Sequence, residues 1–133
     1  MRSRFWILFW IFGILFPMAS LGRLWPPFGR LFNALFAAEW THWIMHTFLY
    51  AILVVLLAQW IRPVYAKAFI SILGLAVVIG CFQEGLQWLT VKSAIGWSAS
   101  AFDLVVDFGG ALIGWAAARL LSSRRADRVV SRG

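Results

Sequence analysis

Charged residues are scarce in this chain. Of 133 residues, 13% are charged and only five are acidic, whereas 62% are hydrophobic. So small a polar fraction cannot cover a water-soluble globule, and the mean hydropathy of +0.83 lies far above that of soluble domains. A single cysteine excludes a disulfide framework within one chain. We therefore expect an integral membrane protein.

The basic residues are more numerous than the acidic ones and give a net charge of +7. Such a charge can indicate a nucleic-acid partner. Here, however, the lysines and arginines separate apolar runs and do not form one patch, which is typical of the flanks of membrane-spanning helices. We expect contact with membrane lipids and no binding of nucleic acid.

Four apolar stretches approach the ~20 residues that a helix needs to cross a bilayer. Isolated spans must be helical, because lipid offers no partners for open backbone groups. The predicted fold class is an all-α membrane protein with four transmembrane helices, forming a single membrane domain over residues 1–133. The spans are expected at about 5–22, 40–61, 68–91 and 101–121.

The segment between the first two spans carries a pair of prolines, Pro26 and Pro27, which can open a short helix. With its arginines and aromatic residues this segment suits the membrane interface, although an ordinary loop is an equal alternative. The polar, basic stretch 122–133 is expected to be a frayed cytoplasmic tail.

Orientation follows from the distribution of basic residues. With four spans, both termini and the 62–67 turn lie on one side and hold eight lysines and arginines, against three on the other side. The side with more basic residues is the cytoplasmic one. The N- and C-termini are therefore predicted to be cytoplasmic.

This orientation places polar side chains of three spans at the same depth in the outer half of the bilayer, roughly 3–14 Å from its boundary. Each charged residue at the centre of a span costs about 2.5–3.5 kcal/mol on insertion, so such residues are functional candidates. We expect them to form one ligand pocket, with Tyr50 as a further ligand-binding residue. They are His42, His46, Gln83, Glu84, Gln87, Asp103 and Asp107.

Helical spacing gathers these residues on shared faces. The two histidines, the two glutamines and the two aspartates are each four residues apart, and residues at that spacing lie on one helix face. Gly110 and Gly114 continue the stripe of the two aspartates. Small residues at this spacing predict close packing against a neighbouring helix.

Several ways of balancing the acidic charge are open. The acids can be protonated, pair with imidazolium groups, or hold a metal ion or a cationic ligand. A metal would be held by His42, His46, Glu84 and Asp103, with Glu84 available as a general base. A histidine-bound pigment is a further candidate cofactor, given nine tryptophans and twelve phenylalanines. Tyr50 either donates a hydrogen bond or braces two helices.

Three pieces of the sequence together resemble the VanZ-like family of small bacterial membrane proteins, which is named for teicoplanin resistance. They are His46-x-x-x-Tyr50, Glu84-x-x-Gln87, and Asp103 followed by Gly110-x-x-x-Gly114. The resemblance covers roughly residues 39–121. It implies a multi-pass protein of the bacterial inner membrane with a role at the cell envelope.

Three functions fit these features. The first is recognition of an envelope lipid or a glycopeptide-like molecule, which needs no catalytic step. The second is an accessory or structural subunit of a larger membrane complex, for example a photosynthetic one. The third is an intramembrane metal-dependent hydrolase that uses the metal ligands named above.

Overall fold

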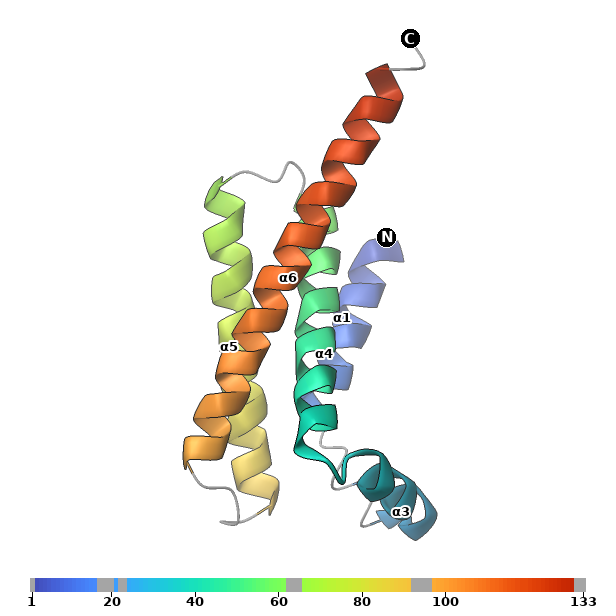
Figure 1. Ribbon diagram of the computed structural model, residues 1–133, viewed down its shortest axis with the longest axis vertical. Helices are drawn as coiled ribbons and strands as arrows, with labels where there is room; N and C mark the ends of the chain where they lie inside the picture. Colours follow the sequence, from blue (N-terminus) through green and yellow to red (C-terminus); the bar gives the residue numbers. More distant parts are fainter. Residues whose placement is uncertain (1, 17–20, 22–23, 62–65, 92–96, 131–133) are drawn as a thin grey trace.

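A computed structural model of the chain describes residues 2–16, 21, 24–61, 66–91 and 97–130. These residues are almost entirely helical and contain no strand (Figure 1). The prediction of an all-helical fold is therefore confirmed. The helices are α1 (Arg2–Leu15), α3 (Pro26–Leu35), α4 (Glu39–Trp60), α5 (Ala66–Val91) and α6 (Trp97–Val130).

Three of these helices, α4, α5 and α6, are long and apolar enough to cross a membrane. They correspond to the second, third and fourth predicted spans. Helix α1 has 14 residues, so its length of about 21 Å is less than the ~30 Å of a hydrocarbon core. The remainder of the predicted first span, 5–22, lies largely outside the described residues, and the count of four spans stays a prediction.

Helix α6 differs most from its prediction. It begins before the expected 101–121 span and continues to Val130, where the sequence analysis expects a frayed tail. The stretch from Ser122 to Val130 contains no glycine or proline, and its alanine and arginine residues favour helix. The helix therefore continues through this polar stretch, and the prediction of a frayed tail from residue 122 is wrong as far as Val130.

Helix α4 lies at the centre of the bundle and packs against α1, α5 and α6. Helices α4 and α6 run in the same direction, and α1 and α5 run the opposite way (Figure 1). The N-terminal end of α1 and the C-terminal end of α6 consequently lie at the same end of the bundle. The Trp10 indole N–H donates to the carbonyl of Leu49 over 2.8 Å and ties α1 to α4.

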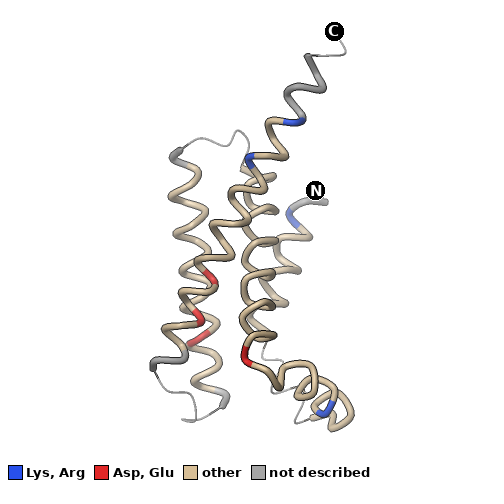
Figure 2. The backbone as a smooth tube through the Cα atoms, viewed as in Figure 1, with Lys and Arg blue, Asp and Glu red and all other residues tan. Residues whose placement is uncertain are grey.

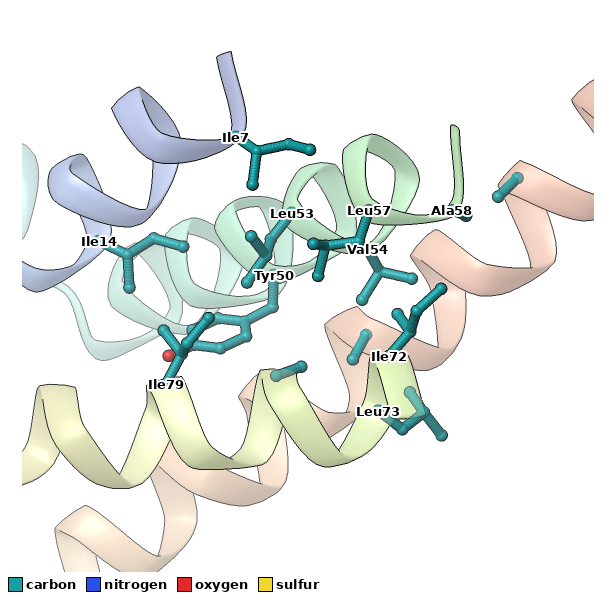
Figure 3. Close-up of a cluster of buried hydrophobic side chains, with 13 residues drawn as sticks. Ile7, Ile14, Tyr50, Leu53, Val54, Leu57, Ala58, Ile72, Leu73 and Ile79 are labelled. Atoms are coloured by element: carbon teal, nitrogen blue, oxygen red, sulfur yellow. The ribbon is translucent and has the colours of Figure 1, made fainter. Parts of the chain in front are cut away.

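The apolar core lies between α1, α4 and α5, and α6 contributes its small residues Ala111 and Ala118 (Figure 3). Leu53 and Leu57 of α4 are almost completely buried, as is Ile72 of α5. Tyr50 extends from α4 toward Ile79 of α5 (Figure 3). In lipid, such packing contributes mainly through van der Waals contact, because the acyl chains are as apolar as the core itself.

Helix α3 bears out the prediction of a short helix opened by prolines. Its first residues are Pro26 and Pro27, whose fixed φ suits the first turn. Phe28, Phe32 and Phe36 follow at four-residue spacing, and the rings of consecutive members contact one another. The helix lies at the end of the bundle where α4 begins, at an angle to the long helices (Figure 1).

The charged residues are divided between the two ends of the bundle. Acidic residues among those described lie in the half nearer α3, whereas basic residues outside α3 lie toward the opposite end (Figure 2). The acids on α5 and α6 belong to segments that otherwise have the composition of membrane spans. This half of the bundle therefore holds the candidate site.

Candidate functional site

Helix α4 supplies the central stripe of the site. His42, His46 and Tyr50 are four residues apart, so their side chains lie one above another on a single face. The rings of the two histidines are in contact, with centroids 4.5 Å apart. Each of the three side chains has a polar partner on α5 or α6, and the three pairs lie at successive depths in the bundle.

The outermost pair joins α4 to α6. His42 Nε2 lies 3.4 Å from Asp103 Oδ2. The two side chains are 35% and 13% exposed, respectively, so this pair can be reached from outside the bundle.

The second pair lies one helical turn deeper and is fully enclosed. His46 Nδ1 lies 2.8 Å from Asp107 Oδ1, and both side chains are buried. An ionised Asp107 carboxylate can only accept a hydrogen bond, which assigns the N–H of the neutral imidazole to Nδ1 and leaves the lone pair on Nε2. That Nε2 atom is buried and has no hydrogen-bond partner among the described residues.

The third pair joins α4 to α5. The Tyr50 hydroxyl donates to Gln83 Oε1 over 3.0 Å, and both residues are buried. Of the two roles considered for Tyr50, this geometry supports the hydrogen bond, which also braces the two helices. Gln87 lies one turn further along α5 and is half-buried.

Glycines bring the helices close enough for these pairs to form. A Cβ atom on Gly110 would lie 2.8 Å from the Cα atom of Thr47, and one on Gly114 would lie 2.8 Å from that of Ala51. Such distances are sterically forbidden, so α6 can approach α4 this closely only with glycine at both positions. The two glycines thus pack directly against α4, on the same face as the aspartates.

A third glycine has a similar role on α5 and was not singled out from the sequence. A Cβ atom on Gly80 would lie 3.3 Å from Asp107 Oδ2 and 3.4 Å from the Tyr50 hydroxyl. The absence of a side chain there lets α5 approach the polar stripe. Its position three residues before Gln83 was the available signal, because residues at that spacing share a helix face.

Comparison with protein-family models, curated proteins and solved structures finds no match to this chain. The chemistry of the site must therefore be derived from its residues and their geometry.

Glu84 lies apart from the three pairs. It follows Gln83, and the ~100° rotation between consecutive helical residues turns it away from Tyr50 and toward the seam between α5 and α6. Glu84 is 7% exposed, neither carboxylate oxygen has a partner within hydrogen-bond geometry among the described residues, and the side chain of Ser100 is a polar neighbour across the seam. Glu84 therefore belongs to none of the three pairs and has its own immediate environment, while its charge still interacts with those of His46, Asp103 and Asp107.

That environment is a cavity of about 340 Å³ between α5 and α6. Its polar lining comes from Glu84 and Ser100, whereas Trp88 and Leu104 contribute apolar surface. The remaining lining residues are Cys81, Gly85 and Ala101, and together with Trp88 they are exposed on the outside of the bundle. The cavity thus opens sideways between the two helices.

The predicted metal ligands separate into two groups. One ligand atom from each of His42, His46 and Asp103 lies within 4.8 Å of the others. Glu84 is not part of this group, because its side chain lines the cavity on the α5–α6 side. Asp107, which the sequence assigned to the pocket only, instead contacts the histidine directly.

Proposed function

We propose that this chain is a multi-pass protein of the bacterial inner membrane that binds an amphipathic component of the cell envelope. Three long apolar helices support the membrane location. The excess of basic residues on the predicted cytoplasmic side supports cytoplasmic termini. An even number of spans is needed to place both termini on that side, which supports the apolar run 5–22 as a fourth span. The resemblance to the VanZ-like family supports a role at the envelope.

The observation that carries the binding proposal is the unpartnered carboxyl group of Glu84 in a cavity that opens sideways. Burying a carboxyl group without a hydrogen bond is costly, and such groups in membrane spans are usually retained for function. A guest that donates a hydrogen bond to this group would remove that cost, once the side chains that cover the two oxygens make room for it. The remainder of the cavity, which is largely apolar, would hold the hydrocarbon part of the guest.

The same geometry defines the chemistry of the guest. An acid favours a head group that presents an ammonium or hydroxyl donor, and it disfavours a bare phosphate or carboxylate. A lateral opening favours entry from the bilayer. The proposed ligand is therefore an envelope lipid, or a lipid-linked glycopeptide-like molecule, whose polar end carries an ammonium group or sugar hydroxyls.

The chain provides its own reporter for testing this binding. Cys81 is the single cysteine, it is exposed, and it lines the cavity. A bound guest should slow its reaction with a membrane-permeant maleimide. The experiment uses the full chain in phosphatidylcholine nanodiscs and adds phosphatidylethanolamine, which carries the same phosphate but an ammonium group that can donate hydrogen bonds.

We expect phosphatidylethanolamine to slow labelling of Cys81 several-fold in the natural chain and to have no effect in Glu84→Gln, which retains the shape of the side chain. Phosphatidylglycerol separates a hydroxyl donor from an ammonium donor. A Glu39→Gln variant is the matched control, because Glu39 is an exposed acid at the start of α4. Equal slowing in Glu84→Gln, or no slowing by any donor lipid, would overturn the proposal.

A further inference from the structure

Three side chains near the N-terminal ends of α4 and α6 lie close together and do not line the cavity beside Glu84. His42, His46 and Asp103 each place a ligand atom within 4.8 Å of the other two. Two imidazoles and one carboxylate are donors that first-row transition metals prefer, whereas Mg²⁺ and Ca²⁺ prefer oxygen ligands alone. The helical spacing of the histidines and the close approach of α6 produce this grouping.

The spacing of the outermost pair fits metal coordination. A zinc ion with bonds of about 2.1 Å holds neighbouring ligand atoms roughly 3.4 Å apart in a tetrahedron. His42 Nε2 and Asp103 Oδ2 are 3.4 Å apart. Because the side chain of His42 is 35% exposed, an ion can reach it from outside.

Asp107 prepares His46 for the same role. In protein metal sites, a ligating histidine usually donates its second ring N–H to a carboxylate, which fixes the tautomer and the ring orientation. Asp107 Oδ1 holds Nδ1 of His46 at 2.8 Å in this way. The Nε2 atom of His46, buried and without a partner among the described residues, is the one left to bind an ion.

The charges also balance around a divalent ion. Within the described residues, Asp103 and Asp107 each pair with a histidine and with no lysine or arginine. The two aspartates, two neutral imidazoles and one divalent cation sum to zero charge, and Glu84 lies outside this set as a neighbouring acid that still interacts with His46 and the two aspartates. A neutral cluster avoids the large cost of isolated charge in a low-dielectric interior.

We propose that His42, His46 and Asp103 form a binding site for a divalent transition-metal ion of the zinc class, with Asp107 as the positioning residue behind His46. Three protein ligands leave a fourth coordination position for water or another small ligand. The site lies on the α4–α6 side of the bundle, and Glu84 is not one of its ligands.

Zinc binding by the purified full chain tests this site. The chain is purified in mild detergent without a polyhistidine tag and in a Cys81→Ser background, because a free thiolate also binds zinc. After dialysis against zinc-free buffer, the metal content is measured by mass spectrometry and the affinity by titration with Zn²⁺. Co²⁺ is then added as a spectroscopic probe, whose visible absorption reports a tetrahedral site with nitrogen and oxygen ligands.

We expect about one zinc ion per chain, and a loss of affinity of at least about 100-fold in His42→Ala and in Asp103→Asn. Asp107→Asn retains an acceptor for His46 but removes the charge, so a smaller loss of about 10-fold is expected. Glu39→Gln removes a nearby exposed acid and should leave the affinity unchanged. Size-exclusion profiles of all variants verify that each chain is folded.

Two results would overturn the metal site. One is a parent chain that retains no stoichiometric zinc and gives no tetrahedral Co²⁺ spectrum. The other is unchanged affinity in both His42→Ala and Asp103→Asn, since zinc would then bind elsewhere. In either case the histidine–aspartate pairs serve only to hold the helices together. Lipid protection of Cys81, measured with and without chelator, is a separate readout, so the two proposals can fail independently.

Discussion

The two faces of α6 that pack against other helices differ in kind. Toward α4, glycines place the backbones in contact and two histidine–aspartate pairs join the helices. Toward α5, the described residues border a cavity of about 340 Å³ beside Glu84 and another of about 50 Å³ beside Asp107. One face is closely packed and paired, and the other has empty volume and an unpartnered carboxyl group.

The two faces of α6 therefore suit two different kinds of binding site. A site that must hold several ligand atoms in fixed positions needs rigid, closely packed helices. A site for a lipid-like guest needs volume and a lateral opening instead. The α4–α6 interface has the first set of properties and the α5–α6 seam has the second, so substitutions on the two faces should have different consequences for stability.

The largest effect is expected from widening the α4–α6 interface. In Gly110→Leu, the new side chain would overlap the Thr47 backbone, which cannot rotate away as a flexible side chain could. We expect a loss of about 3 kcal/mol in the free energy of unfolding. Unfolding of the detergent-solubilised chain by increasing amounts of SDS, followed by circular dichroism, measures this change.

Gly109→Leu is the matched control for that prediction. It adds the same side chain at the adjacent position, where a Cβ atom meets nothing within 4 Å. Leucine also has the higher helix propensity, so the control should retain the stability of the parent or gain slightly. Equal destabilisation by the two substitutions would show that α6 does not touch α4 at Gly110.

A smaller loss is expected from removing one member of the enclosed pair. Asp107→Ala leaves His46 Nδ1 buried without an acceptor, and interhelical hydrogen bonds in membranes contribute up to about 1.7 kcal/mol. With the cost of the unpaired ring, we expect a loss of about 2 kcal/mol. Glu39→Ala, which removes an exposed acid, should change stability by less than about 0.5 kcal/mol. Similar losses in the two variants would contradict a specific role for the pair.

Much of the α4–α6 face could be predicted from the sequence, because it depends on spacing alone. The four-residue intervals of the histidines and aspartates, continued by Gly110 and Gly114, placed these residues on facing stripes. Which histidine meets which aspartate could not be predicted, because that depends on the register between helices. The register is set by contacts of Gly110 and Gly114 with the backbone of α4, and sequence spacing does not show it.

The α5–α6 face was less predictable for a different reason. Gln83 and Glu84 are adjacent and similar in character, so sequence alone grouped them in one pocket and assigned Glu84 to the metal ligands. The rotation between consecutive helical residues separates them, and only the packed structure shows that Gln83 meets Tyr50. A cavity cannot be predicted from sequence spacing either, because it arises where the side chains of two packed helices leave space between them.

The smallest effect is expected at Glu84, and it should have the opposite sign. Because this carboxyl group is buried without a partner among the described residues, Glu84→Gln replaces an ionisable group by a neutral one of the same shape. We expect an increase of a few tenths to about 1 kcal/mol in the free energy of unfolding, measured by the same SDS titration in lipid-free detergent.

A gain in stability at Glu84 combined with the loss of lipid protection at Cys81 would have one physical explanation. Residues that are retained at a cost in stability are those on which binding depends, whereas residues of a structural interface stabilise the fold directly. The opposite outcome is equally informative. If Glu84→Gln destabilised the bundle as much as Asp107→Ala, the carboxyl group would be joining α5 to α6 as the aspartate joins α6 to α4, and the seam would have no place for a guest.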